Sequence, residues 1–441
     1  MTAAPLTTWT ENGPTDEELL AKYRPVFARI AEGALERESS GRLALEEAGW
    51  LREAGFPAVR VPREFGGDGA SLRQLYLLVV ELAAAESNLP HALRVHLRFV
   101  EDRWRERHTP RGQEWLRRIG AGLVFGTAVS EREGTFRKPA TTLRSVDGRL
   151  LLNGKKYYST GALYGDYLTV AALDDSEERV TAVVRADTQG VERIDDWAGF
   201  GQRASASGTT IFTDVEVDGP EAIFPPPGGT AGHLAHFQLT HLATIAGIVR
   251  RATDDIAEFV RRRHRTYPAA KAAVAAQDPL IQHVVGRNDA VAYALRAIVL
   301  DAAASLDAAA DLGYAFRTTP EAERTAEAEA EVTAAELKAE LDAFRAQSVV
   351  LDLGLKATTE IFEVGGASAL DRKYQFDRHW RNVRTLASHN PLIYREQQLG
   401  DYVLNGTAPT FLSPEGASVI TGAAGAPTDA AEGATSAGSP T

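Results

Sequence analysis

Residues 145–158 read SVDGRLLLNGKKYY, and this stretch decides the fold class because it marks a β region inside an otherwise helical chain. It holds an Asp-Gly pair and an Asn-Gly pair, and such pairs between apolar residues are the strongest short-range signal of a β-hairpin. Further strands are expected at 167–173, 179–185 and 209–217, the last with a regular alternation of apolar and polar residues. The sequence therefore predicts a compact β domain.

The sequence on both sides of this β region has a helical pattern, with apolar residues three and four positions apart. The expected helices cover residues 16–32, 43–54, 71–85, 239–265, 280–312, 321–354 and 356–364. The chain is thus helical, then β, then helical.

A chain of 441 residues exceeds what one hydrophobic core usually supports, so several domains are expected. The final residues contain no Lys, Arg or aromatic side chain and cannot bury enough apolar surface to become ordered. The predicted division is an N-terminal helical domain (1–120), a central β domain (121–229), a C-terminal helical bundle (230–412) and a disordered tail (413–441).

Composition excludes several classes of function. The net charge of −12 argues against a nucleic-acid partner, which needs a basic surface. The chain has no cysteine, which rules out disulfides, thiolate nucleophiles and cysteine-based zinc sites. No apolar stretch reaches the length of a membrane span, so no membrane association is expected. The polar, acidic N-terminal residues lack the pattern of a secretory signal, and a cytoplasmic protein is predicted.

Glycine and histidine clusters do not by themselves indicate a ligand. Gly66–Gly69 and Gly199–Gly201 are interpreted as turns, because neither lies at a strand-to-helix junction nor completes a GxGxxG motif. His233, His236 and His241 lie close together in sequence, but no nearby carboxylate completes a metal site. Ordinary packing is the favoured interpretation of these histidines, and no metal is predicted.

Two polar segments leave alternatives open. Arg261, Arg262, Arg263 and Arg265 either stabilise the end of a helix or bind a phosphate group, because guanidinium groups suit both roles. Residues 376–391, FDRHWRNVRTLASHNP, form either a solvated helix face or part of a ligand pocket. In a pocket, His389 would be a proton donor or acceptor. His91 and His96 are five positions apart on an expected helix and should point in different directions.

Five motifs together resemble the acyl-CoA dehydrogenase superfamily: PREFGGDG (62–69), SEREGTF (130–136), NGKKYYSTGA (153–162), DDWAGFGQRASASGTTIF (195–212) and FEVGGASALDRKYQFDRHWRNVRT (362–385). The resemblance covers residues 19–409 and is nearest to the branch of reduced-FMN-dependent monooxygenases typified by dibenzothiophene monooxygenase. It implies an α+β fold with an N-terminal helical domain, a central β-barrel or sandwich, and a C-terminal four-helix bundle.

The resemblance also bears on the type of reaction. A typical acyl-CoA dehydrogenase uses a glutamate as base in its last domain, and that element aligns here with His389, Asn390 and Pro391. Asn390 cannot act as a base, which favours the monooxygenase branch. An FAD-dependent acyl-CoA dehydrogenase with a displaced base stays open as the alternative.

Residue roles follow from the same resemblance. Catalytic roles are implied for His389 and His91, which match histidines that flank the reactive edge of the flavin, and for Thr160 and Thr127, the latter standing where an asparagine is expected. The implied flavin contacts are Tyr158, Thr160, Trp197, Arg265, Arg263, Arg384 and Ser368. Arg265 matches a phosphate contact across a subunit interface, whereas Ser368 replaces a second phosphate-binding arginine. Arg261, Arg263 or Arg384 could compensate for that replacement.

The implied chemistry begins when reduced flavin reacts with O2 to give a C4a-hydroperoxide in a dry site. His389 would then protonate the departing oxygen. The chain shows no nicotinamide site, so reduced FMN is expected from a separate flavin reductase, with FAD as the alternative cofactor. The other expected partners are a small-molecule substrate and the further subunits of a homotetramer. Sulfur, an amino-sugar nitrogen and an electron-rich aromatic carbon are all compatible targets.

Overall fold

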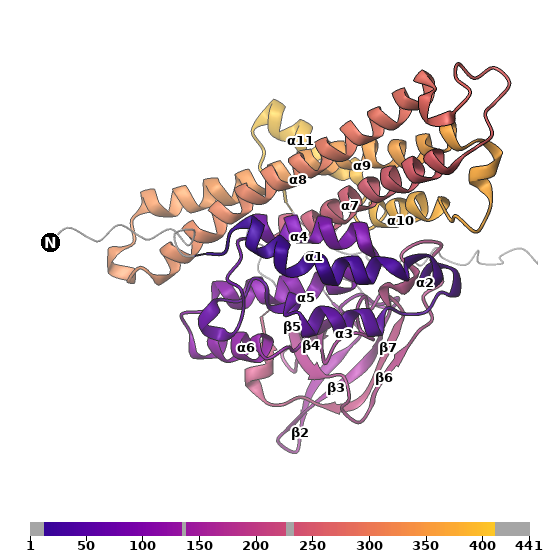
Figure 1. The fold of residues 1–441 in the computed structure, drawn as a ribbon. Coiled ribbons are helices and arrows are strands. Elements are labelled where there is room, and N and C mark those ends of the chain that lie inside the picture. Colours follow the sequence, from indigo (N-terminus) through magenta and orange to yellow (C-terminus); the bar gives the residue numbers. More distant parts are fainter. Residues whose placement is uncertain (1–12, 135–137, 226–232, 411–441) are drawn as a thin grey trace, which may run out of the picture.

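A computed structural model describes residues 13–134, 138–225 and 233–410 of the chain. A group of shorter helices lies between a β-sheet on one side and long helices on the other (Figure 1). The α+β fold predicted from the sequence is confirmed. The predicted tail, residues 413–441, lies outside the described residues.

The N-terminal helices are α1 (Asp16–Glu32), α2 (Ala34–Ser40), α3 (Leu45–Glu53), α4 (Leu72–Ala85), α5 (Asn88–Arg105) and α6 (Pro110–Gly120). Capping boxes begin two of them, because Thr15 exchanges hydrogen bonds with Glu18 at α1, and Ser71 with Gln74 at α4. Most residues of α4 are buried, and this helix contacts both α1 and the long C-terminal helices. It forms the centre of the main hydrophobic core.

The strands are β1 (Phe125–Ala128), β2 (Thr142–Val146), β3 (Arg149–Lys156), β4 (Tyr167–Leu173), β5 (Arg179–Arg185), β6 (Val191–Ile194), β7 (Thr209–Glu216) and β8 (Ile223–Phe224). They form one sheet in the order β6-β7-β3-β2-β4-β5-β8, with β1 beside β4. The β2–β3 hairpin turns at Asp147 and Gly148, whose φ angles of 51° and 77° suit a mirror-image turn.

The Asn-Gly pair of the same stretch has another role. Gly154 lies inside β3, where the pairing of β3 with β7 shifts register. A Cβ atom at Gly154 would lie 2.4 Å from the side-chain oxygen of Thr141. The glycine therefore permits a close approach to a neighbouring segment and does not form a turn.

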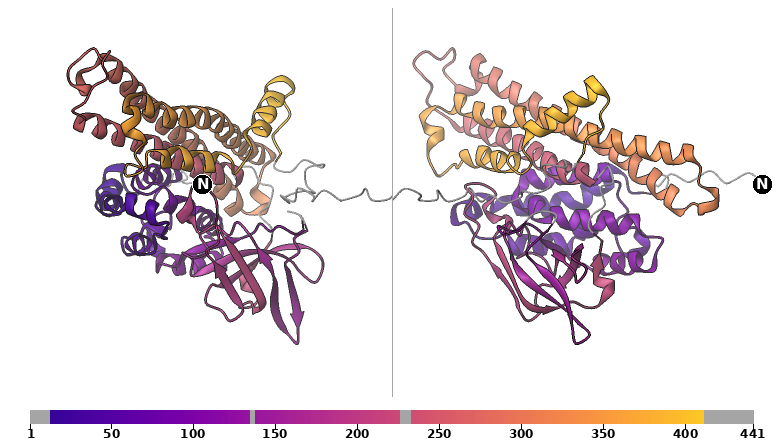
Figure 2. Two further views of the ribbon diagram at one scale, coloured as in Figure 1. Left: turned by 90° about the vertical axis from the view of Figure 1, so that its right-hand side faces the viewer. Right: turned by 180° about the vertical axis from the view of Figure 1, so that it is seen from behind.

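The C-terminal helices are α7 (His233–Arg262), α8 (Pro279–Thr318), α9 (Ala326–Gly365), α10 (Asp377–Ala387) and α11 (Leu392–Asn405). The long helices α7, α8 and α9 pack on one another, and Figure 2 shows this bundle from two further sides. The expected helix boundary after Gly354 is wrong, because α9 runs through it. A Cβ atom at Gly354 would lie 2.7 Å from a methyl group of Ile245, so the glycine allows α9 to pack closely on α7.

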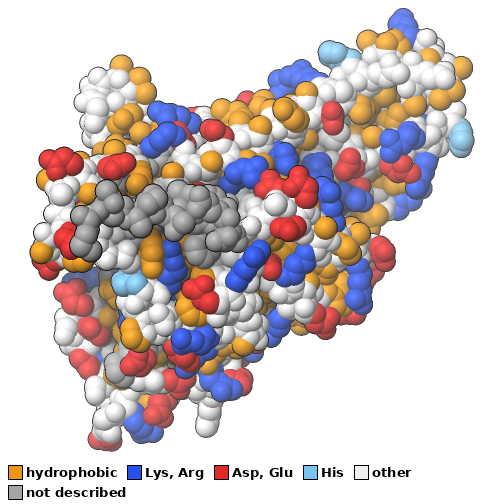
Figure 3. Space-filling view, turned by 60° about the vertical axis from the view of Figure 1, so that its left-hand side comes forward, with side chains coloured by type: hydrophobic (Ala, Val, Ile, Leu, Met, Phe, Trp, Pro, Cys, Tyr) orange, Lys and Arg blue, Asp and Glu red, His pale blue; other side chains and the backbone are white. Residues whose placement is uncertain are grey.

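The surface carries acidic, basic and hydrophobic side chains together (Figure 3). Among residues 13–134, 138–225 and 233–410, no helix combines the length and the apolar character of a membrane span.

Candidate active site

Gln202 lies where the N-terminal helices, the β domain and α10 meet. It is fully buried, and its amide nitrogen donates to Ser87 Oγ at 3.0 Å. Its side-chain oxygen lies 3.1 Å from His91 Nδ1, and its backbone N–H donates to Asn382 Oδ1 at 2.6 Å. Because the amide oxygen can only accept, His91 carries its proton on Nδ1. The buried Nε2 of His91 is then an acceptor, and it has no partner within the described residues.

The loop that carries Gln202 reaches α10 because of Gly201. A Cβ atom at Gly201 would lie 2.3 Å from the carbonyl oxygen of Arg381. The same loop is tied to Trp197, whose indole N–H donates to Gln202 O at 3.1 Å. The Trp197 ring stands edge-on to Tyr158, with ring centres 6.0 Å apart. Tyr158 is exposed and has a φ angle of 59°, a left-handed conformation that is uncommon for a non-glycine residue.

A chain of hydroxyl groups continues from Gln202 towards the predicted flavin residue Thr160. Ser205 Oγ donates to Gln202 O at 2.7 Å, Ser207 Oγ lies 2.8 Å from Ser205 Oγ, and Thr160 Oγ1 lies 2.9 Å from Ser207 Oγ. Since the Ser205 proton is used on the carbonyl, Ser207 donates to Ser205 and Thr160 donates to Ser207. Thr160 therefore offers only lone pairs to a ligand. Thr127, on β1, donates its backbone N–H to Thr160 O at 3.2 Å, so these two predicted residues do lie together.

Three histidines from distant segments form one cluster. The ring centre of His241, on α7, lies 5.4 Å from that of His91 and 4.4 Å from that of His389. Both ring nitrogens of His241 are buried and have no hydrogen-bond partner among the described residues. Asn390 holds the segment that carries His389, because its side chain donates to Gln238 at 2.9 Å and its carbonyl accepts from Gln347 at 3.0 Å.

The three histidines share a depressed pKa. Loss of hydration, followed by the charge of Arg94, lowers the pKa of His91 to about 3, while the hydrogen bond to Gln202 opposes the shift. Burial and then the neighbouring His389 hold the pKa of His241 well below its usual value. Loss of hydration and then the charge of Arg94 also act to lower the pKa of His389, although this residue is exposed in the single chain. The buried rings of His91 and His241 are therefore neutral near pH 7.

His96, the other histidine of α5, has a structural role. Its Nε2 donates to Pro57 O at 2.8 Å, and its Nδ1 accepts the backbone N–H of Phe125 at 3.3 Å. Both nitrogens are thus used, unlike those of His241. His91 and His96 point to different partners, as their spacing predicts.

The predicted phosphate residues lie elsewhere on the chain. Arg263 donates to Val364 O at 3.0 Å and to Gly365 O at 3.2 Å, so it closes the end of α9. Arg265 and Ser368 are exposed. At 1.5 Å of rise per residue, the end of α7 at Arg262 is roughly 30 Å from His241. One chain does not bring these groups to the histidine cluster, and their contact with a flavin stays a prediction.

Three further arginines have partners close to them in sequence: Arg261 and Arg262 at the end of α7, and Arg384 on α10. Arg261 and Arg262 both pair with Glu258, at 3.0 and 2.5 Å. Arg384 contacts Ser388 Oγ at 3.1 Å and lines, with it, a cavity of about 810 Å³ between α9 and the start of α11.

Sequence reasoning missed Gln202, His241, Arg94 and the two serines Ser205 and Ser207. The serines and Gln202 lie in a motif that already carried the resemblance, so the hydroxyl-rich ASASGTT run was the available signal. His241 was interpreted as a packing residue, because its sequence neighbours do not show which segments face it.

The chain resembles known proteins over most of its length. The acyl-CoA dehydrogenase C-terminal domain family matches residues 239–392. A dibenzothiophene monooxygenase of Mycolicibacterium goodii is 32% identical over 394 residues, which cover 85% of this chain and 91% of that protein. The chain belongs to the dibenzothiophene monooxygenase family. As a member of this family it is an oxidoreductase, and the predicted resemblance is confirmed.

Two further relatives of this family member broaden the comparison. SfnC of Pseudomonas putida, described as a probable FMNH2-dependent monooxygenase, is 28% identical over 403 residues, covering 89% of this chain and 97% of that protein. The solved structure of methanesulfinate monooxygenase MsuC from Pseudomonas fluorescens has a TM-score of 0.75 and 26% identity, covering 89% and 98% of the two chains. The acyl-CoA dehydrogenase fold expected from the motifs is thus confirmed.

Proposed function

We propose that the protein is the oxygenase component of a two-component monooxygenase, which uses reduced FMN and O2 to oxygenate a small molecule. The observation that carries this proposal is the cluster of the His91, His241 and His389 rings beside a chain of oriented hydroxyl groups. Family membership favours this reaction over the FAD-dependent dehydrogenase. Asn390 supports the same choice, because its amide is engaged with Gln238 and cannot remove a proton.

The residues present fit a reduced flavin. Tyr158 and Trp197 offer aromatic surface for a planar ring system, and the Thr160 hydroxyl can accept an N–H of such a ring. The orphaned Nε2 of His91 is a buried acceptor for which no protein partner is described. When bound, reduced FMN supplies the two electrons with which O2 is activated.

The chain's own residues then hold or donate protons and exclude water. His91 Nε2 accepts a hydrogen bond and so keeps a proton in place, while the His389 ring lies where it can donate a proton. Burial of His91 and His241 excludes water, which would otherwise compete for the reactive oxygen. Gln202 and Asn390 are positioning residues, which orient the histidines through their hydrogen bonds.

A separate flavin reductase and a homotetramer complete the proposal. Neither glycine-rich segment forms a nucleotide-binding loop, so reduced FMN would come from another protein. Large hydrophobic side chains are exposed on the helical bundle, which supports self-association: Leu280, Tyr293, Ile393, Tyr394, Val403 and Leu404. A neighbouring subunit would also bring Arg265 to the FMN phosphate. The cytoplasmic location stays a prediction from residues that are largely outside the described ranges.

The test supplies the protein with FMN, a flavin reductase and NADH, and measures O2 uptake together with oxygenated product. The two relatives named for their substrates act on dibenzothiophene and methanesulfinate, so sulfur compounds are the first to assay. Product should form, and saturated acyl-CoA thioesters with an artificial electron acceptor should not be oxidised. Robust acyl-CoA turnover without O2 uptake would contradict the proposal.

A further inference from the structure

Arg94, on α5, is a buried cation without an acidic partner. Its exposed fraction is 8%, and no hydrogen bond or ion pair joins it to any residue within 13–134, 138–225 and 233–410. Its Nε is among the buried atoms that lack a partner, and the guanidinium instead lies 4.9 Å from the centre of the Phe237 ring. Burial lowers the pKa of Arg94 to about 10, so the group is still charged near pH 7.

The position of Arg94 joins it to the histidine cluster. His91 and Arg94 are three residues apart on α5, and Phe237 and His241 are four residues apart on α7, so each pair shares one face of its helix. These faces oppose each other, because His91 contacts His241 and Arg94 contacts Phe237. The guanidinium and the imidazoles therefore line one region between the two helices.

The charge that acts on the histidines in this region is positive. The charge of Arg94 contributes to the depressed pKa of His91, of His241 and of His389, so it acts on all three rings. No carboxylate contributes to these shifts or to that of Arg94 itself. A buried charge normally has a counter-charge and hydrogen bonds, because its desolvation is otherwise uncompensated. The missing partner is thus an anion, and guanidinium and imidazole N–H groups suit its oxygen atoms.

We propose that Arg94 and His241 bind an oxyanion carried by the substrate, such as a carboxylate, sulfinate or sulfonate group, and so hold the substrate beside His91 and His389. The assignment to the substrate follows from the elements involved. Tyr158, Thr160 and Trp197, which fit the flavin, belong to the β domain, whereas Arg94 is covered by α7. This inference rests on the proposed function and adds a substrate class to it.

Isothermal titration of the FMN-loaded protein tests the inference with matched probes. Benzenesulfinate and benzoate carry the anion, while methyl phenyl sulfone and benzamide are neutral analogues of similar size. The wild type should prefer the anions, and Arg94→Gln should reduce their affinity about ten- to hundred-fold without changing that of the neutral probes. Arg345→Gln is the matched control, because Arg345 is exposed on α9 and pairs with Asp342 at 2.9 Å.

Folding and cofactor binding are measured on the same samples. Arg94→Gln loses no hydrogen bond, so its melting temperature should match that of the wild type. Should it nevertheless fail to fold, His241→Gln carries the test, with a smaller loss of anion affinity expected. Equal affinity for charged and neutral probes, or no binding of either anion, overturns the inference. So does an Arg94→Gln variant that loses FMN affinity and keeps its anion affinity, because the guanidinium would then serve the cofactor.

The proposed function fails by a different result. A wild type that binds the anions but binds no FMN and consumes no O2 with the reductase would refute the monooxygenase and leave the anion site standing.

Discussion

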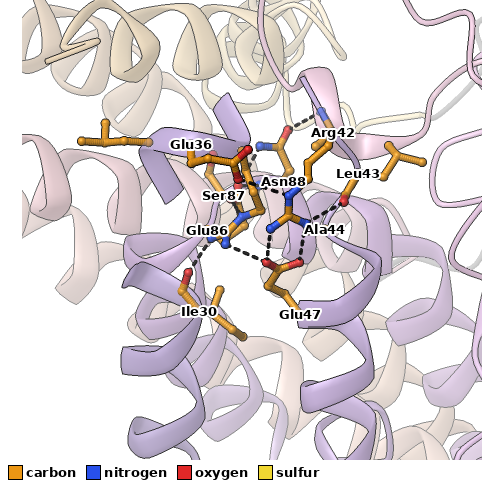
Figure 4. Close-up of polar contacts among 12 residues, drawn as sticks. Ile30, Glu36, Arg42, Leu43, Ala44, Glu47, Glu86, Ser87 and Asn88 are labelled. Carbon is orange, nitrogen blue, oxygen red and sulfur yellow. Dashed lines mark hydrogen bonds and ion pairs between the residues drawn. The ribbon is translucent and has the colours of Figure 1, made fainter. Parts of the chain in front are cut away.

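Arg37 and Arg94 are both buried arginines of the N-terminal helices, and their surroundings are opposite. Arg37 is 2% exposed, and its guanidinium donates to Glu86 at 2.9 Å, to Glu47 at 2.9 Å and to the carbonyl of Ile30. Figure 4 shows these acceptors together, with Arg42 reaching the same Glu47. Arg94 is 8% exposed, and the part of the chain that the structure describes supplies it with no such partner. Burial alone therefore does not distinguish a structural charge from a functional one, whereas the presence of a partner does.

The hydrogen-bond network around Arg37 also supports the region around His91. Glu86 accepts hydrogen bonds from the backbone and side chain of Asn88, whose oxygen accepts the backbone N–H of Ala204 at 3.1 Å. The loop from 202 to 206 is thereby fixed to the start of α5. Because Gln202 lies in that loop and orients His91, the Arg37 network stabilises the geometry of the candidate site.

The largest expected effect is on catalysis, at His389 of the histidine cluster. His389→Ala should lower product formation by about 10²–10⁴-fold, since a positioned proton donor contributes about that much. The melting temperature should change little. Electrons would be lost as hydrogen peroxide, so product and peroxide are measured together with FMN and the reductase present. Wild-type coupling in this variant would give the role to His91 or His241 instead.

Replacing the two arginines by methionine tests the comparison directly. Arg37→Met leaves Glu47 and Glu86 buried without their shared cation and should cost about 3 kcal/mol of unfolding free energy. Arg94→Met removes an uncompensated charge, so the free energy of unfolding should stay almost unchanged or increase. Urea denaturation of both variants provides the measurement. Equal destabilisation would mean that Arg94 has a structural partner after all.

The exposed Arg265 extends the comparison to arginines outside the core. If a neighbouring subunit brings it to the flavin phosphate, Arg265→Ala should weaken FMN binding about ten- to hundred-fold, the usual value of a charge-assisted contact. Fluorescence titration with FMN measures this loss, and Arg345→Ala is the control. Unchanged affinity would assign the phosphate to Arg261, Arg263 or Arg384.

The last expected effect is a dependence of stability on pH. Burial lowers the pKa of His96 to about 4 and that of His91 to about 3, from an ordinary value of 6.5. As the pH falls below 6.5 the unfolded chain binds these protons first, so stability is complete above 6.5 and declines towards pH 4. Each ring should contribute about 1.4 kcal/mol per pH unit in this window. Denaturation between pH 7 and 4.5 checks the slope, which should be shallower in His96→Gln.

Local signals in the sequence were sufficient for much of the fold. The helix at 16–32 and the strands at 167–173 and 179–185 agree with α1, β4 and β5 at both ends. Their boundaries depend on neighbouring residues, such as the capping box of Thr15 and Glu18. The order of helical and β segments, together with the motifs, was likewise sufficient to identify the family.

The role of a glycine cannot always be predicted from the residues next to it in the sequence. The Asp-Gly pair at 147–148 does form the hairpin turn, because its two residues adopt the required φ angles themselves. Gly154 and Gly354 are needed instead for close approach to Thr141 and to Ile245, which other segments supply. The sequence around each glycine does not distinguish these two cases.

The candidate site depends on the tertiary structure in the same way. The motifs pointed to His91, His389 and Thr160 before any contact was known. The roles of Gln202, His241 and Arg94 follow only from whether their polar atoms have partners, and those partners are distant in sequence. His91 and Gln202, for example, are 111 positions apart. Only the folded chain decides which buried polar atoms are satisfied, because hydrogen bonds form over about 3 Å in space and not along the sequence.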